Sequence, residues 1–151
     1  MTEPTAPPLV VAPGRIGFCN GCFDLLHEGH LYFLEQAKMH CGYLIVAVNS
    51  DRWIRRVKGE CRPFQSQIER MHNVMTRASA WVDAVIPFEG REDNLIMEIR
   101  PHVIIKGYDH QSTDKYCVRA PGWKDGTGWD IIDAVHIGHL PGYSTTLKAQ
   151  Q

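Results

Sequence analysis

Apolar residues occur in short continuous runs that alternate with amphipathic stretches. Five runs have the length of a strand, and they cover residues 15–20, 43–49, 84–88, 102–106 and 132–140. The second run is nearly unbroken, which is typical of a strand buried on both faces of a parallel sheet. Pro87 indicates that the third run is an edge strand or the end of a strand.

Helical spacing fills the first interval between these runs. Apolar residues recur every three or four positions in residues 28–41, at Leu31, Leu34, Ala37 and Cys41. Gly42 follows and is expected to end this helix.

A capping box predicts a second helix. Ser66 is expected to be the N-cap and Glu69 the third helical residue, with the helix running to about Ala80. Its buried side is expected to carry Ile68, Met71, Met75 and Ala78. A short helix over residues 92–100 is ended by Pro101.

Strands that alternate with helices predict an α/β fold. We expect a Rossmann-like five-stranded parallel sheet with helices on both faces, formed by residues 15–151 as a single domain. Residues 1–14 are rich in proline and are expected to form a disordered or extended arm. Residues 107–130 lack clear periodicity; a long loop is expected there, either a lid or substrate loop or a decoration without a catalytic role.

The composition excludes some classes of protein. The chain has 151 residues, 44% of them hydrophobic, and a net charge of -1, which favours neither nucleic acid nor an anionic membrane as a partner. No apolar stretch is long enough to cross a bilayer and none resembles a signal peptide. Five irregularly spaced cysteines indicate reduced thiols and a cytoplasmic location. A redox or zinc role for Cys19 and Cys22 would need a thioredoxin-like context or a second ligand pair.

Basic residues cluster in one segment. They are Arg52, Arg55, Arg56, Lys58 and Arg62. Two interpretations remain open, a solvated face or a phosphate-binding loop.

Two histidines follow the first predicted strand. His27 and His30 flank Gly29 at the start of a predicted helix, so both side chains would project to one side. A helix N-terminus attracts phosphate, and Gly29 leaves room for it. Two imidazoles there can stabilise the charge of a nucleotidyl-transfer transition state. Two other interpretations are a pair of structural histidines and a zinc site with Asp24 as third ligand.

A series of motifs resembles one known family. The string Gly21-x-Phe23-Asp24-x-x-His27-x-Gly29-His30 resembles the signature of the cytidylyltransferase-like family of HIGH-type nucleotidyltransferases. Within it, the chain most resembles the adenylyltransferase domain of bifunctional ADP-heptose synthases. That resemblance continues in order through residues 45–51, 57–59, 62–63, 69–71, 82–83, 104–107, 109 and 142–146.

The resemblance implies a role for each matching residue. Catalytic roles fall to His27, His30 and Lys58, with Lys58 on a flexible loop. A nucleotide site would be formed by Gly21, Cys22, Phe23, Gly29, Lys106, Gly107, Asp109, Tyr143, Ser144 and Thr145. An acceptor site would include Asp24, Asp51 and Arg62. From the residues alone, the turn over 142–146 opens a helix and suits either an anion site or an ordinary helix cap.

The expected function is therefore transfer of a nucleoside monophosphate from an NTP to a small phosphorylated acceptor, such as a sugar phosphate. Mg²⁺ is expected to accompany the NTP, and no protein metal site is expected. The position where cytidylyltransferases usually carry an arginine is His139, which favours ATP over CTP. The alternatives are a cytidylyltransferase acting on an alcohol phosphate, an FAD synthetase and a non-catalytic nucleotide-binding module. The resemblance also implies a homo-oligomer.

Overall fold

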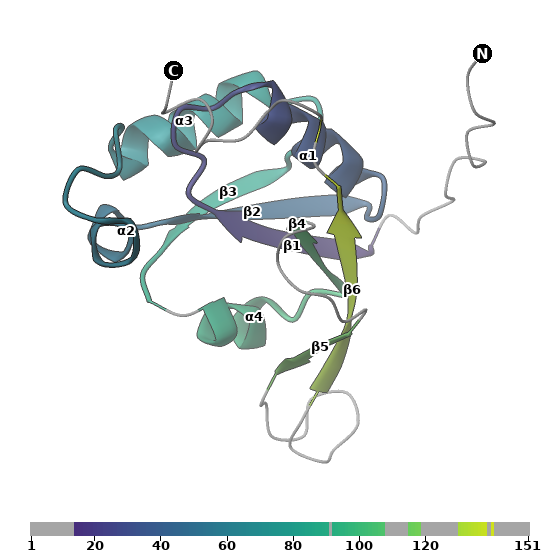
Figure 1. Ribbon diagram of the computed structural model, residues 1–151. Helices are drawn as coiled ribbons and strands as arrows, with labels where there is room; N and C mark the ends of the chain where they lie inside the picture. The colour runs from purple at the N-terminus through teal and green to yellow at the C-terminus, as the bar shows by residue number, and fades with distance from the viewer. Residues whose placement is uncertain (1–13, 91, 108–114, 119–129, 139, 141–151) are drawn as a thin grey trace.

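The computed structural model describes residues 14–90, 92–107, 115–118, 130–138 and 140 (Figure 1). Its centre is one sheet of six strands in the order β3-β2-β1-β4-β6-β5. Five strands run parallel: β1 (Ile16–Gly21), β2 (Tyr43–Asn49), β3 (Ala84–Phe88), β4 (Val103–Gly107) and β6 (Asp130–Ile137). The predicted five-stranded parallel sheet is confirmed, and Pro87 does lie in the edge strand β3.

A sixth strand corrects the prediction of one long loop over residues 107–130. β5 (Lys115–Val118) pairs antiparallel with β6, with Lys115 opposite Asp133 and Val118 opposite Asp130. Four residues are too few to show the alternation by which a strand is recognised in a sequence. β5 therefore adds an edge strand to the sheet, within a segment for which the sequence predicted neither a helix nor a strand.

Helices cover both faces of the sheet, as predicted. They are α1 (Glu28–Lys38), α2 (Asp51–Lys58), α3 (Gln67–Arg77) and α4 (Glu92–Ile99). Figure 1 shows α1 and α3 on one face and α4 on the other. Leu34 of α1 and Val74 of α3 lie in one buried cluster, whereas Ile96 of α4 packs with Phe18 and Ile104 in a second.

Helix α2 was not predicted. The basic segment begins as a helix rather than as a loop, with the Ser50 hydroxyl accepting a hydrogen bond from the backbone N–H of Trp53 at 3.1 Å. Only Ile54 is buried in this helix. One buried position is too few to give a recognisable amphipathic pattern in such a charged segment.

Helix α3 begins at the predicted cap, but only part of its predicted buried side faces inward. Ala78 is fully buried and Met71 packs against the core, as predicted. The Ser66 hydroxyl accepts from the backbone N–H of Glu69 at 3.2 Å, which confirms the N-cap. Ile68 and Met75, predicted to be buried, are 80% and 55% exposed. Arg70 lies inside instead, because its guanidinium meets backbone carbonyls there. A sequence pattern that counts only apolar residues cannot detect such a buried arginine.

Candidate active site

A cavity of about 460 Å³ lies at the carboxyl ends of β1, β2 and β4. Seven of its lining residues were singled out in the sequence: Gly21, Cys22, Phe23, His30, Lys58, Lys106 and Gly107. Parallel sheets bind ligands at this edge, beside the point where the strand order reverses. That point lies between β1 and β4, since β2 and β3 extend the sheet on one side of β1, and β4 and β6 on the other.

The loop between β1 and α1 forms the floor of the site. Phe23 and Leu25 have left-handed φ angles of 51° and 54°. Such angles cost a non-glycine residue of order 1 kcal/mol or more, so the surroundings must hold them. A Cβ at Gly21 would lie 3.0 Å from the ring of Phe23, so the absent side chain lets that ring fold back. The glycine thus shapes the loop as well as lining the cavity.

The two histidines of the motif are joined at the start of α1. The backbone N–H of Gly29 donates to Nδ1 of His27 at 3.0 Å, and the backbone N–H of His27 donates to Nδ1 of His30 at 3.1 Å. Their ring centroids are 3.9 Å apart. Because each Nδ1 accepts a hydrogen bond, the proton of each neutral ring resides on Nε2. The pair therefore caps the helix and also has the tautomer that donates from Nε2.

Burial keeps the His30 ring neutral. Burial, the largest cause, and the charges of His27, Lys58 and Arg77 together lower the pKa of His30 to about 3. His30 lines the cavity, whereas His27 is buried and lines an adjoining hollow with Arg77. The two rings lie next to each other, as expected, but they line two different hollows.

Lys58 is the last residue of α2 and reaches into the site. The positive charge of its ammonium lowers the pKa of His30 and the pKa of the Cys22 thiol. Burial raises the pKa of Cys22, and Lys58 offsets part of that rise. The prediction of a flexible loop at this residue is wrong, since α2 carries it. Arg52, Arg55 and Arg56 are exposed, so the basic segment combines a solvated face with one cavity cation.

A polar cluster lines the cavity between β1 and β4. The ammonium of Lys106 donates to Glu92 at 2.8 Å and to the side-chain oxygen of Asn20 at 3.2 Å. The Asn20 amide also donates to Glu92 at 2.8 Å. Sequence reasoning missed Glu92, whose only signal is an acidic residue in the first turn of a helix. The charge of Lys106 is thus balanced inside the cavity.

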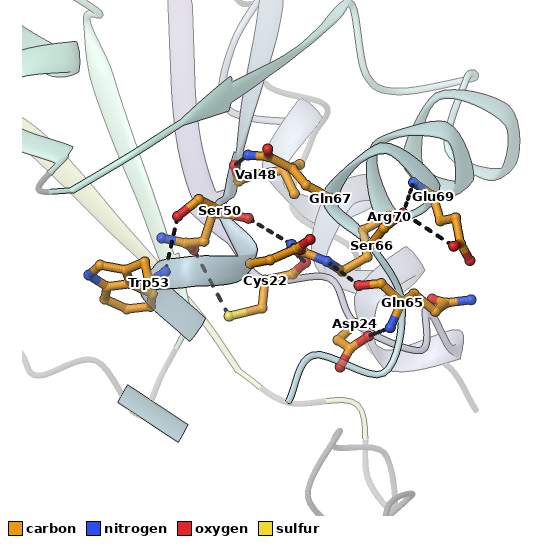
Figure 2. A network of polar contacts seen from close by, with 12 residues as sticks. Cys22, Asp24, Val48, Ser50, Trp53, Gln65, Ser66, Gln67, Glu69 and Arg70 are labelled. Atoms are coloured by element: carbon orange, nitrogen blue, oxygen red, sulfur yellow. Dashed lines mark hydrogen bonds and ion pairs between the residues drawn. The ribbon is translucent and has the colours of Figure 1, made fainter. Parts of the chain in front are cut away.

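Arg70 ties together the segments that form the site (Figure 2). Its guanidinium is fully buried and donates to three backbone carbonyls, those of Cys22 at 2.7 Å, Asn49 at 2.9 Å and Gln65 at 3.0 Å. It also forms an ion pair of 2.6 Å with Asp51. One side chain therefore fixes the β1–α1 loop, the end of β2 and the approach to α3. The sequence showed this arginine only as part of a family motif.

All three residues expected at the acceptor site have partners within the chain, since Asp51 forms the ion pair with Arg70. Asp24 is 3% exposed, and its two oxygens accept from the backbone N–H groups of Phe64 and Gln65 at 2.7 and 3.0 Å. The guanidinium of Arg62 lies 4.7 Å from the ring centroid of Phe64. Neither side chain lines the cavity. Asp51 remains 34% exposed beside it and keeps its assignment as a prediction.

The redox and zinc interpretations find no support. Cys19 is fully buried and burial raises its pKa, so it is not an accessible thiolate. The Asp24 carboxylate is held by backbone N–H groups. Among the residues that the structure describes, no group of three His, Cys, Asp or Glu side chains could hold a metal ion.

Several predicted site residues lie outside the described residues. They are Asp109, Tyr143, Ser144 and Thr145, together with His139 and the arm over residues 1–13. Their assignments remain predictions.

Comparison with known proteins identifies the family. Residues 18–128 match the model of the cytidylyltransferase-like family. The chain belongs to the cytidylyltransferase-like family and is a nucleotidyltransferase domain. It is 43% identical over 135 residues to the bifunctional protein HldE of Acidiphilium cryptum and 37% identical over 134 residues to that of Aliarcobacter butzleri. Each match covers 87% of this chain but only 26% and 25% of the relative, so the chain spans about a quarter of their length.

Solved structures share the fold. A lipopolysaccharide core biosynthesis protein from Thermoplasma volcanium has a TM-score of 0.66 at 24% identity, over 83% of this chain and 98% of that chain. Pantothenate synthetase from Thermus thermophilus has a TM-score of 0.55 at 15% identity, over 93% of this chain and 66% of that one. At these identities the likeness concerns the fold alone. No helix in the described part of the chain is long and apolar enough to span a membrane.

Proposed function

We propose that this domain transfers the nucleoside monophosphate of an NTP, with ATP preferred to CTP, to a small phosphorylated acceptor such as a sugar phosphate. One observation carries the proposal. The imidazole of His30, at the start of α1, and the ammonium of Lys58 line the cavity beside the switch point of the sheet, and the ring of His27 lies against that of His30. Helix N-termini and cations attract phosphate, and this arrangement suits the α-phosphate of a nucleotide.

The reaction is an in-line displacement. A phosphate oxygen of the acceptor forms a bond to the α-phosphorus while the bond from that phosphorus to the pyrophosphate oxygen breaks. The attacking oxygen is already negatively charged at neutral pH, so no general base is needed. The Nε2–H groups of the two histidines donate to the α-phosphate oxygens as charge builds, and Lys58 neutralises part of it.

The neutral state of His30 suits this role. A ring that already donates from Nε2 needs no proton uptake before it binds phosphate. Its orientation is fixed by the bond from the backbone N–H of His27, so little reorganisation is required during the reaction. Positioning of this kind supplies much of the rate in phosphoryl-transfer enzymes.

Magnesium enters with the triphosphate in this proposal. Mg²⁺ prefers phosphate oxygens and water to a cage built by protein side chains. The described residues offer no such cage. We further propose a cytoplasmic enzyme that acts as a homo-oligomer.

The test is a screen of nucleotides against acceptors. Pyrophosphate release is measured with ATP and CTP, each with sugar phosphates, glycerol 3-phosphate and FMN. We expect ATP with a sugar phosphate to be the most active pair, and His27→Ala and His30→Ala to lower kcat far more than they raise KM. CTP with glycerol 3-phosphate would favour a cytidylyltransferase and FMN an FAD synthetase. Nucleotide binding without turnover of any acceptor would reject catalysis.

A further inference from the structure

One face of α2 is turned towards the cavity. Trp53, Val57 and Lys58 all line it. The spacing of four residues places Trp53 and Val57 on one helix face, and Lys58 reaches the cavity from the last position of the helix. The helix is anchored by its buried residue Ile54, which is 1% exposed. The backbone N–H of Trp53 is bound by the Ser50 cap at 3.1 Å. This face is therefore held in place.

Part of this cavity wall is apolar. Trp53 and Val57 of α2 and Phe33 of α1 line it together with the polar residues His30 and Lys58. Val57 remains 56% exposed. Lys58 lies close enough to His30 to lower its pKa. The α1–α2 side of the cavity thus joins a phosphate-binding end to an aromatic and aliphatic surface.

The nucleoside has a different place. Open parallel sheets bind nucleotides at the switch point, which here lies between β1 and β4. The polar cluster of Asn20, Glu92 and Lys106 lies there and offers hydrogen-bonding groups suited to a base and a ribose. The α1–α2 side is left for the second substrate.

We infer that Trp53 is a specificity-determining residue which packs against the ring of the acceptor, while Lys58 holds the phosphate of that acceptor next to the α-phosphate of the NTP. This inference rests on the proposed nucleotidyl transfer. A pyranose ring suits the surface, because one of its faces presents C–H groups and its hydroxyls point outward to the rim. Trp53 and Lys58 line the same cavity, so a ring packed on Trp53 would lie in the cavity that Lys58 also lines.

The test compares acceptors in Trp53 variants. KM and kcat are measured with six- and seven-carbon aldose 1-phosphates, glycerol 3-phosphate and FMN, at saturating NTP. Trp53→Ala should raise the KM for an aldose 1-phosphate about tenfold, through the loss of ring packing. Trp53→Phe keeps an aromatic surface and should retain most of the affinity. The KM for the NTP should change less than twofold in both variants, and circular dichroism checks that both fold.

Each outcome bears on one of the two claims. A rise in the KM for the NTP rather than for the acceptor would overturn the inference and place the nucleoside on Trp53. Turnover of only glycerol 3-phosphate or FMN by the unmodified chain would also overturn it, while nucleotidyl transfer would stand. Failure of every NTP and acceptor to release pyrophosphate would reject the proposed function itself, and the inference with it.

Discussion

Replacing Arg70 by methionine tests how the loops of the site are held together. Methionine retains much of the apolar length of the side chain but removes every hydrogen bond. Three backbone carbonyls, those of Cys22, Asn49 and Gln65, lose their donor, and Asp51 loses its ion-pair partner. A buried polar group without a partner costs about 1–3 kcal/mol, and breaking a fully buried ion pair costs about 3–5 kcal/mol. The Asp51 side chain is 34% exposed, so loss of its pair with Arg70 costs less than that.

Some of these groups can rehydrate, since Cys22 and Gln65 are only half-buried. We therefore expect Arg70→Met to lower the free energy of unfolding by about 3–5 kcal/mol in total. For a domain of this size the melting temperature would fall by roughly 6–20 °C. Arg70→Lys keeps the charge but cannot reach all four acceptors, so an intermediate loss is expected.

Thermal unfolding followed by circular dichroism measures the effect. Arg77→Met is a matched control, because Arg77 is an exposed arginine of the same helix whose guanidinium donates to the carbonyl of Leu26 at 2.7 Å. Its replacement should cost about 1 kcal/mol. If Arg70→Met melted no lower than Arg77→Met, the role given to the Arg70 network would be refuted.

Three further predictions concern charge and packing. The pKa of His30 is lowered to about 3 from 6.5, so only the unfolded chain takes up this proton as the pH falls below about 6.5. The melting temperature should therefore fall as the pH is lowered, and it should fall less steeply in His30→Asn. An equal dependence of the melting temperature on pH in both proteins would contradict this. Glu92→Gln removes the carboxylate that pairs with Lys106 at 2.8 Å and should change the KM for the NTP several-fold with little effect on the KM for the acceptor, as initial rates would show. A Cβ at Gly17 would lie 2.6 Å from the sulfur of Cys41, so Gly17→Ala should destabilise the fold by about 1–3 kcal/mol in urea unfolding. Gly138→Ala, with nothing within 4 Å of its Cβ, should be nearly neutral; similar losses in both alanine variants would count against the packing argument.

The parallel strands could be predicted because buried strands appear in the sequence as short continuous apolar runs. The run over residues 43–49 is apolar on both faces and became β2 with the predicted bounds. The histidine pair could also be predicted, since its position depends only on a strand end and a helix start. These features are local, and local spacing determines them.

The features that escaped prediction depend on contacts between distant segments. Arg70 is buried because carbonyls up to 48 positions away in the sequence accept its hydrogen bonds. Glu92 enters the site because Lys106 and Asn20 meet it from two neighbouring strands. The apolar pattern of α3 was right for Ala78, which is buried, but wrong for Ile68, which is exposed. The spacing of residue types along the chain does not reveal contacts between segments that are distant in sequence.

The central claim is that the histidine pair stabilises transfer of the α-phosphate. The most direct measurement follows ATP labelled in that phosphate, with magnesium and an aldose 1-phosphate, in a single turnover. We predict that the label moves to the acceptor with release of unlabelled pyrophosphate, and that His27→Ala and His30→Ala slow this step by orders of magnitude. Label appearing in free AMP without an acceptor product, or near-normal transfer in both variants, would contradict the account.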